Sequence, residues 1–262
     1  MRNKKTIWSF GDSFSEEVVS LFAHPHSMNN ERCRYVTEYL NEIPYKTWPA
    51  IVADKLNYNY INRAASGGKQ FKYLGGGNSN DQMFYNVTEY SSEFKKDDIV
   101  VVGFTNPGRY QVPNPKSYDK LGGTMNVLPN SNLGVNEKRY LETYIERNES
   151  SYYLNEMLQK FKILETLSKV VGFTIYYWNW TGNFHYTPDL NTDNWIVHQM
   201  YGKFIGFEHI FKLHGGILET IFDETNGEYK DGHWGKNTNE ILGDIFYNHI
   251  KKTHQKIKRT II

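Results

Sequence analysis

The sequence predicts an α/β domain built on a mostly parallel β-sheet. The apolar run at residues 6–10 breaks at Gly11, and two acidic residues follow, which indicates a strand, a tight turn and a helix. Residues 99–102 (Ile-Val-Val-Val) are apolar without alternation, as in central parallel strands that are buried on both faces. Farther along the 262-residue chain, stretches with helical spacing separate the strand-like runs.

Strand and helix signals alternate along the chain. The predicted strands are 6–10, 58–62, 99–102 and 172–178, and the predicted helices are 16–22, 45–56, 82–90, 137–170 (in one or two pieces) and 237–252. We expect Trp48 in the core, because it shares a helical stripe with other apolar residues. The signal between 189 and 218 is mixed.

The chain shows no internal repeat and no low-complexity linker, which favours a single domain over residues 1–262. Residues 110–135 are rich in Pro, Gly and Asn. We expect them to form a long loop insertion, which serves either as a lid over the site or as a contact surface.

Composition narrows the class of protein. Hydrophobic residues make up 39%, enough for a sizeable core, and the net charge of +1 predicts neither nucleic acid nor a membrane surface as partner. Cys33 is the single cysteine, so a disulfide or a multi-thiolate metal site within the chain is excluded. We expect no metal and no cofactor. The basic residues 2–5 run straight into the first strand, so we expect no signal peptide and no membrane span, and a cytoplasmic or virion-associated location.

Ser13 follows the first strand at the point where a parallel sheet places its ligands. On the first turn of a helix, free backbone N–H groups would favour the oxyanion that forms when a hydroxyl attacks a carbonyl. Serine is also a common helix N-cap, so Ser13 is either a nucleophile or a plain cap on this segment alone.

Asp231 and His233 lie two residues apart in a stretch with no helical pattern. In an extended backbone alternate side chains point the same way, so the carboxylate could hold one imidazole nitrogen while the other faces Ser13. The alternative is a plain turn with an exposed histidine.

Taken together, these segments resemble the SGNH, or GDSL-type, hydrolase family. Residues 11–14 (Gly-Asp-Ser-Phe) look like its first block, and residues 62–67 are similar to the second, whose glycine N–H, here that of Gly67, helps form the oxyanion hole. Residues 231–233 (Asp-Gly-His) resemble the last block, ahead of a terminal helix. The resemblance implies a flavodoxin-like three-layer α/β/α sandwich with about five strands, and ester hydrolysis without metal.

The chain departs from the family pattern at three points. The third block reads Gly-Phe-Thr-Asn at 103–106, so either Thr105 or Asn106 would complete the oxyanion hole. The acid and histidine of the last block are two apart, where three is usual. Residues 77–81 resemble a continuation of the second block in phage-borne relatives, which makes Gly77 a rival to Gly67.

The resemblance implies a serine esterase in which His233 activates Ser13 and Asp231 orients His233. The oxyanion would be held by Ser13, Gly67 and Thr105 or Asn106. The expected substrate is a small-molecule or polysaccharide ester, with an O-acetyl group on a carbohydrate as the favoured case. Aromatic residues at the end of the fourth strand either stack on a sugar or fill the loop core; they are Trp178, Trp180, Phe184 and Tyr186.

The sequence leaves two further function classes open. One is a weakly active or inactive protein of the same fold, a virion structural or carbohydrate-binding component, with a virion or homo-oligomeric assembly as its setting. The other is a nucleotide-binding flavodoxin-like protein, which ranks far behind because the chain has no G-x-x-x-x-G-K-[ST] loop.

Overall fold

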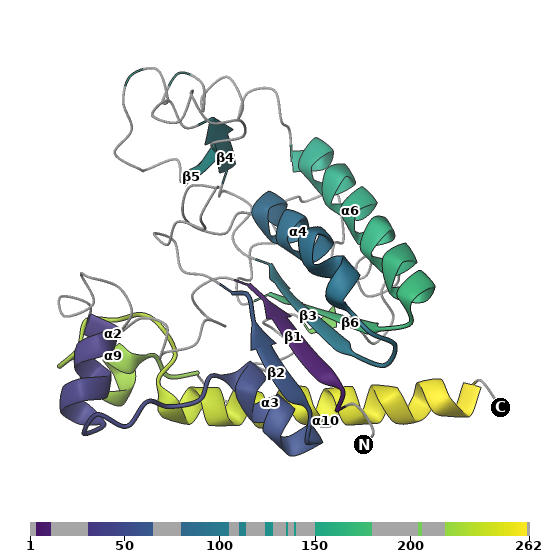
Figure 1. The fold of residues 1–262 in the computed structure, drawn as a ribbon. Coiled ribbons are helices and arrows are strands. Elements are labelled where there is room, and N and C mark those ends of the chain that lie inside the picture. Colours follow the sequence, from purple (N-terminus) through teal and green to yellow (C-terminus); the bar gives the residue numbers. More distant parts are fainter. Residues whose placement is uncertain are drawn as a thin grey trace.

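The computed structural model describes residues 4–11, 31–64, 80–104, 110–113, 124–127, 135, 139, 150–179, 204–205 and 218–260. For residues 104, 110–113, 124–127, 150–158, 179, 204–205 and 253–260 it describes the backbone alone. The described residues form three layers, with helices on both faces of a central sheet (Figure 1). The predicted α/β class is therefore confirmed.

The central sheet has five strands in the order β2-β1-β3-β6-β7, and every neighbouring pair is parallel. Its strands are β1 (Thr6–Phe10), β2 (Asn59–Asn62), β3 (Ile99–Phe104), β6 (Thr174–Asn179) and β7 (Phe204–Ile205). The predicted strand at 6–10 has the predicted bounds, and the run at 99–102 lies in β3 between β1 and β6. Its valines are buried, as expected for a central strand.

One face of the sheet is covered by α4 (Asn80–Glu89) and α6 (Ser150–Val171) (Figure 1). The short 3-10 helix η3 (Tyr90–Glu93) continues α4. The core on this side joins Trp8 and Phe10 of β1 to Met83 of α4 and Phe161 of α6. Burial of such side chains is the main favourable term in folding, at about 25 cal/mol per Å² of apolar surface.

The other face is covered by α3 (Trp48–Leu56) and α10 (Lys236–Thr260). Trp48 is fully buried, as predicted, and stacks on Phe246 with ring centroids 4.0 Å apart. The helix begins at Trp48 and not at Tyr45, because Pro49 occupies its first turn and Thr47 before it is extended. It ends at Asn57, which adopts the left-handed conformation.

A third, smaller cluster lies beside the sandwich, where α2 (Glu31–Arg34) and the π-helix η2 (Tyr35–Tyr39) face α9 (Ile221–Glu224) (Figure 1). Its buried side chains include Tyr35, Tyr45, Ile221 and Tyr229. This cluster joins segments from opposite ends of the chain.

The predicted loop insertion contains regular structure. Strands β4 (Tyr110–Pro113) and β5 (Thr124–Val127) pair antiparallel in a separate two-stranded sheet. Such short strands are hard to predict from sequence when Pro and Gly are frequent. These residues lower the strand propensity of a segment but do not prevent two short strands from pairing. Two further helices differ in their bounds from prediction: α4 begins at Asn80, and α10 extends to Thr260. Of the helix predicted at 137–170, the described part comprises the helical Arg139 and α6. The helix expected at 16–22 lies outside the described residues.

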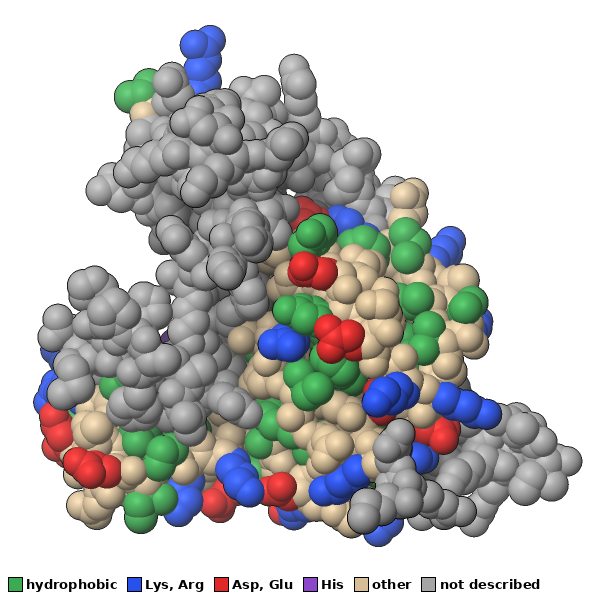
Figure 2. All heavy atoms as spheres, in the orientation of Figure 1, with side chains coloured by type: hydrophobic (Ala, Val, Ile, Leu, Met, Phe, Trp, Pro, Cys, Tyr) green, Lys and Arg blue, Asp and Glu red, His purple; other side chains and the backbone are tan. Residues whose placement is uncertain are grey.

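The described surface carries both signs of charge. On the face in Figure 2, Lys and Arg side chains are interspersed with Asp and Glu, in keeping with the net charge of +1. None of the helices in the described part of the chain is long and apolar enough to cross a bilayer.

Candidate active site

The strand order fixes where a ligand would bind. From β1 the chain moves to β2 on one side and then to β3 on the other, so the order reverses between β1 and β3. In open parallel sheets ligands bind at such a switch point, beyond the carboxyl ends of the strands. β1 ends at Phe10 and β3 at Phe104. The first sequence block therefore follows β1, and the third begins in the last two residues of β3, so both lie at the ends of the strands that flank this point.

Asp231 and His233 form a close pair. The imidazole Nδ1 of His233 lies 2.5 Å from Oδ1 of Asp231, and the backbone N–H of His233 donates to the same oxygen at 2.7 Å. The carboxyl-to-N–H bond across two residues is an Asx-turn, which fixes the aspartate rotamer. Because an ionised carboxylate only accepts, Nδ1 carries a proton and proton transfer would fall to Nε2.

Electrostatics keep Asp231 ionised although it is nearly buried. Its exposed fraction is 9%, against 30% for the His233 side chain. Burial acts to raise the pKa of Asp231, but the hydrogen bonds and charge of His233, together with the charge of Arg32, hold that pKa below its ordinary value of 3.8. An ionised carboxylate behind an imidazole is what a general base requires.

The segment that carries the pair is tied to the N-terminus of α9. The backbone N–H of Ile221 donates to the His233 carbonyl at 2.7 Å, and that of Phe222 to the Asp231 carbonyl at 3.0 Å. Thr220 and Asp223 cap the same helix end with a capping box. The free N–H groups at the start of α9 and the carbonyl groups of the loop thus satisfy each other's hydrogen-bonding capacity.

Trp234 links the pair to the edge of the sheet. It is 5% exposed and packs against Trp178, with ring centroids 5.8 Å apart. Trp178 is the penultimate residue of β6 and pairs in register with Gly103, the penultimate residue of β3. The residue after His233 therefore lies against the carboxyl ends of β3 and β6.

The end of β2 is also ordered at this edge. The Arg63 N–H donates to the Ser9 carbonyl at 2.7 Å, and the Asn62 side chain accepts from the Ala64 N–H at 2.7 Å. The Arg63 guanidinium lies 4.4 Å from the centre of the Tyr90 ring. The second sequence block therefore begins beside β1.

The structure brings together two of the predicted site residues, Asp231 and His233. The other predicted site residues lie outside the described residues: Ser13, Gly67, Gly77, Thr105 and Asn106. In the described part of the chain, no group of three or more His, Cys, Asp or Glu could hold a metal ion. Trp178 is fully buried, so it fills the core and does not stack on a sugar.

Sequence reasoning missed two buried residues, Arg32 and Tyr45. The charge of Arg32 acts on Asp231, and the Tyr45 hydroxyl donates to the carbonyl of Trp234, the residue after His233. The run Glu-Arg-Cys-Arg at 31–34 has the composition of a solvated helix turn, and no local pattern marks its first arginine as buried. Only long-range packing reveals it.

No family model matches the chain, and no curated protein matches it either. One similar solved structure is that of a protein from Desulfitobacterium hafniense DCB-2 provisionally assigned to the G-D-S-L lipolytic family. It has a TM-score of 0.45 and 10% sequence identity, and the match covers 94% of this chain and 99% of that one. A similarity of this size does not establish a shared activity, so the case for function rests on this chain's own residues.

Proposed function

We propose that the chain is a serine esterase in which Ser13, His233 and Asp231 act as a catalytic triad. The observation that carries the proposal is the 2.5 Å contact between His233 Nδ1 and Asp231 Oδ1. Next to this pair, Trp234 packs against Trp178 at the edge of the sheet. Gly11 follows β1 at that edge, and Ser13 comes two residues later in the sequence.

In the proposed reaction, Nε2 of His233 accepts the proton of Ser13 as its Oγ attacks the ester carbonyl carbon. The oxyanion is held by the N–H groups of Ser13 and Gly67 and by Thr105 or Asn106. The C–O bond then breaks and His233 returns the proton to the leaving alcohol. A water molecule, deprotonated by His233, attacks the acyl group and releases the acid with Ser13 restored.

The proposed substrate is an O-acetyl group on a carbohydrate. Because Trp178 is buried, stacking on a sugar would fall to the aromatic residues that follow it, Trp180, Phe184 and Tyr186. A panel of acetylated sugars compared with longer aryl esters tests this substrate class. Preference for an aryl ester with a long acyl chain would argue against it.

The proposed nucleophile is tested by replacing Ser13. Ser13→Ala should lower hydrolysis of p-nitrophenyl acetate by about a thousandfold or more, because the attacking oxygen is lost. A fluorophosphonate should label the wild-type chain, with the adduct mapped to Ser13 by mass spectrometry. The matched control is Ser9→Ala, which removes a buried hydroxyl on β1 that has no hydrogen-bond partner in the described structure.

We expect the Ser9→Ala variant to keep full activity and the Ser13→Ala variant to keep its circular dichroism spectrum. Unchanged turnover in folded Ser13→Ala would end the triad assignment. A wild-type chain that resists the fluorophosphonate would favour the alternative, an inert virion or carbohydrate-binding protein with this architecture.

A further inference from the structure

Arg32 is a buried cation behind the candidate active site. It lies in α2 and is 3% exposed. A guanidinium that has left water needs an anion or strong acceptors nearby, because its desolvation is otherwise uncompensated. Asp231, 9% exposed, is a carboxylate on which the charge of Arg32 acts.

A second connection runs from Arg32 to the backbone beside His233. Nε of Arg32 donates to the hydroxyl of Tyr45 at 3.3 Å, and that hydroxyl donates to the carbonyl of Trp234 at 3.0 Å. The Asn239 amide donates to the same carbonyl at 3.1 Å. Burial raises the pKa of Tyr45, so its hydroxyl keeps the proton that it donates.

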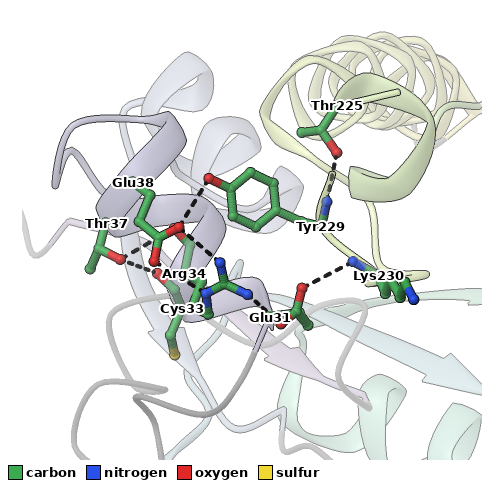
Figure 3. A network of polar contacts seen from close by, with 8 residues as sticks. All are labelled: Glu31, Cys33, Arg34, Thr37, Glu38, Thr225, Tyr229 and Lys230. Atoms are coloured by element: carbon green, nitrogen blue, oxygen red, sulfur yellow. Dashed lines mark hydrogen bonds and ion pairs between the residues drawn. The ribbon is translucent and has the colours of Figure 1, made fainter. Parts of the chain in front are cut away.

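Side chains on the outer side of α2 form hydrogen bonds to the residues before Asp231. Figure 3 shows Arg34 between Glu31 and Glu38, while Tyr229 and Lys230 face the same two carboxylates. The Tyr229 hydroxyl donates to Glu38 at 3.3 Å, and the Lys230 N–H donates to Glu31 at 3.1 Å. α2 therefore contacts the segment ahead of Asp231 and, through Tyr45, the residue after His233.

We propose that Arg32 is a positioning residue, whose buried charge and bond to Tyr45 hold the Asp231–His233 pair in the geometry that proton transfer needs. This proposal rests on the proposed esterase function. Arg32 acts through Asp231 and Tyr45 and does not touch the substrate. It also gives a physical reason for burying a charged side chain at this place in the fold.

Several charged or titratable groups determine how the pair responds to pH. In the described part of the chain they are His233 on the same segment, Arg32 on α2, Tyr45 before α3, and Glu224 on α9, which acts on Tyr45. Burial opposes the ionised form of Asp231, and contacts with His233 and the charge of Arg32 favour it. Arg32 is the one group among these four with a fixed positive charge.

The test compares Arg32→Met with the wild type. Loss of the buried positive charge lets the pair bind a proton more readily. The acid limb of the plot of kcat against pH should therefore shift to higher pH by about one unit. At pH 7, kcat should fall about tenfold while KM changes less than about twofold. Arg32→Lys, which keeps the charge, should restore the position of the acid limb.

The matched control is Lys46→Met, which removes a positive charge from the residue after Tyr45. Lys46 pairs with Asp54 at the surface, and its side chain is 65% exposed. We expect this variant to leave kcat and the acid limb unchanged. Tyr45→Phe isolates the hydrogen bond to Trp234 and should lower kcat without moving the acid limb; wild-type kcat would overturn that part of the proposal.

A measurement without substrate separates this inference from the esterase proposal. Carbon NMR of aspartate-labelled protein, with Asp231 assigned through an Asp231→Asn variant, follows the titration midpoint of the Asp231 carboxyl, on which the charge of Arg32 acts. The midpoint should rise in Arg32→Met and return in Arg32→Lys. If Arg32→Met does not fold, the comparison of Arg32→Gln with Arg32→Lys carries the same expectation.

The outcomes distinguish the two proposals. An active wild type whose Asp231 midpoint is the same in the neutral and charged variants at position 32 would overturn the role of Arg32 alone. An inert wild type whose midpoint still follows Arg32 would overturn the esterase proposal and support the coupling of Arg32 to the pair.

Discussion

At the scale of single residues, Asp231 combines burial with charge. Its carboxylate accepts two hydrogen bonds from His233, one from the ring and one from the backbone. Burial works against ionisation, yet the contacts with His233 and the charge of Arg32 hold the pKa of Asp231 below its ordinary value of 3.8. The same arrangement that suits a general base therefore also contributes to stability.

This coupling predicts a pH dependence of stability. Because the pKa of Asp231 is lower in the folded chain than in the unfolded one, the folded chain binds fewer protons around pH 3.8. The stabilisation is complete above that value and is lost as the pH falls through the folded-state pKa. Urea titrations from pH 7 to pH 3 should show the stability gap between wild type and Asp231→Asn constant at first and then narrowing in acid.

A gap that stays constant down to the lowest pH at which both proteins fold would contradict this account of Asp231. It would mean that the carboxylate titrates alike in the folded and unfolded chains. The measurement needs no substrate, so it is independent of the esterase proposal.

At the scale of elements, the sheet depends on a buried carboxylate at the start of β3. Asp98 is 2% exposed. It accepts from the Thr6 N–H at 2.9 Å, the Trp8 indole at 3.2 Å and the Lys95 N–H at 3.0 Å. One side chain thus holds the beginning of β1 against β3, the two strands that flank the switch point.

Asp98→Ala should therefore destabilise the fold by about 3 kcal/mol, because three donors lose a charged acceptor in a buried place. The matched control is Asp97→Asn: Asp97 pairs at the surface with Lys5 at 3.4 Å, and asparagine tolerates its φ of 71°. We expect a change below about 0.5 kcal/mol in that control. Equal effects of the two substitutions in urea denaturation would contradict the role of Asp98.

The elements that the sequence predicted best are those with a strong local signal. β1 and β3 are continuous apolar runs ending at glycine or polar residues, and Trp48 lies on a clear helical stripe. Local pattern fails for β7, which has two residues and forms only beside β6. It fails in the same way for Arg32, whose buried charge acts on Asp231 from a distant part of the chain.

The Asp231–His233 contact could be predicted because the two residues are close in sequence and need no tertiary information to meet. The structure joins them through an Asx-turn, where the sequence predicted an extended stretch. The rest of the candidate site could not be fixed in this way. Its oxyanion donors follow different strands, and whether Thr105 or Asn106 contributes depends on loop conformation that spacing does not determine.

At the scale of the whole molecule, a parallel sheet carries residues from distant parts of the chain to one edge. β1 lies near the start of the sequence and α10 at its end, yet Trp234 ahead of α10 packs on Trp178 where β6 ends. The order reversal between β1 and β3 makes this edge the expected place for a ligand. The proposed triad would join the two ends of the chain there.

The most direct test of this account is a crystal structure of the chain with a fluorophosphonate bound. We predict a covalent adduct on Oγ of Ser13 and an imidazole Nε2 of His233 within about 3 Å of that oxygen, the reach of a hydrogen bond. An adduct on another residue, or Ser13 lying beyond hydrogen-bond reach of His233, would contradict the triad.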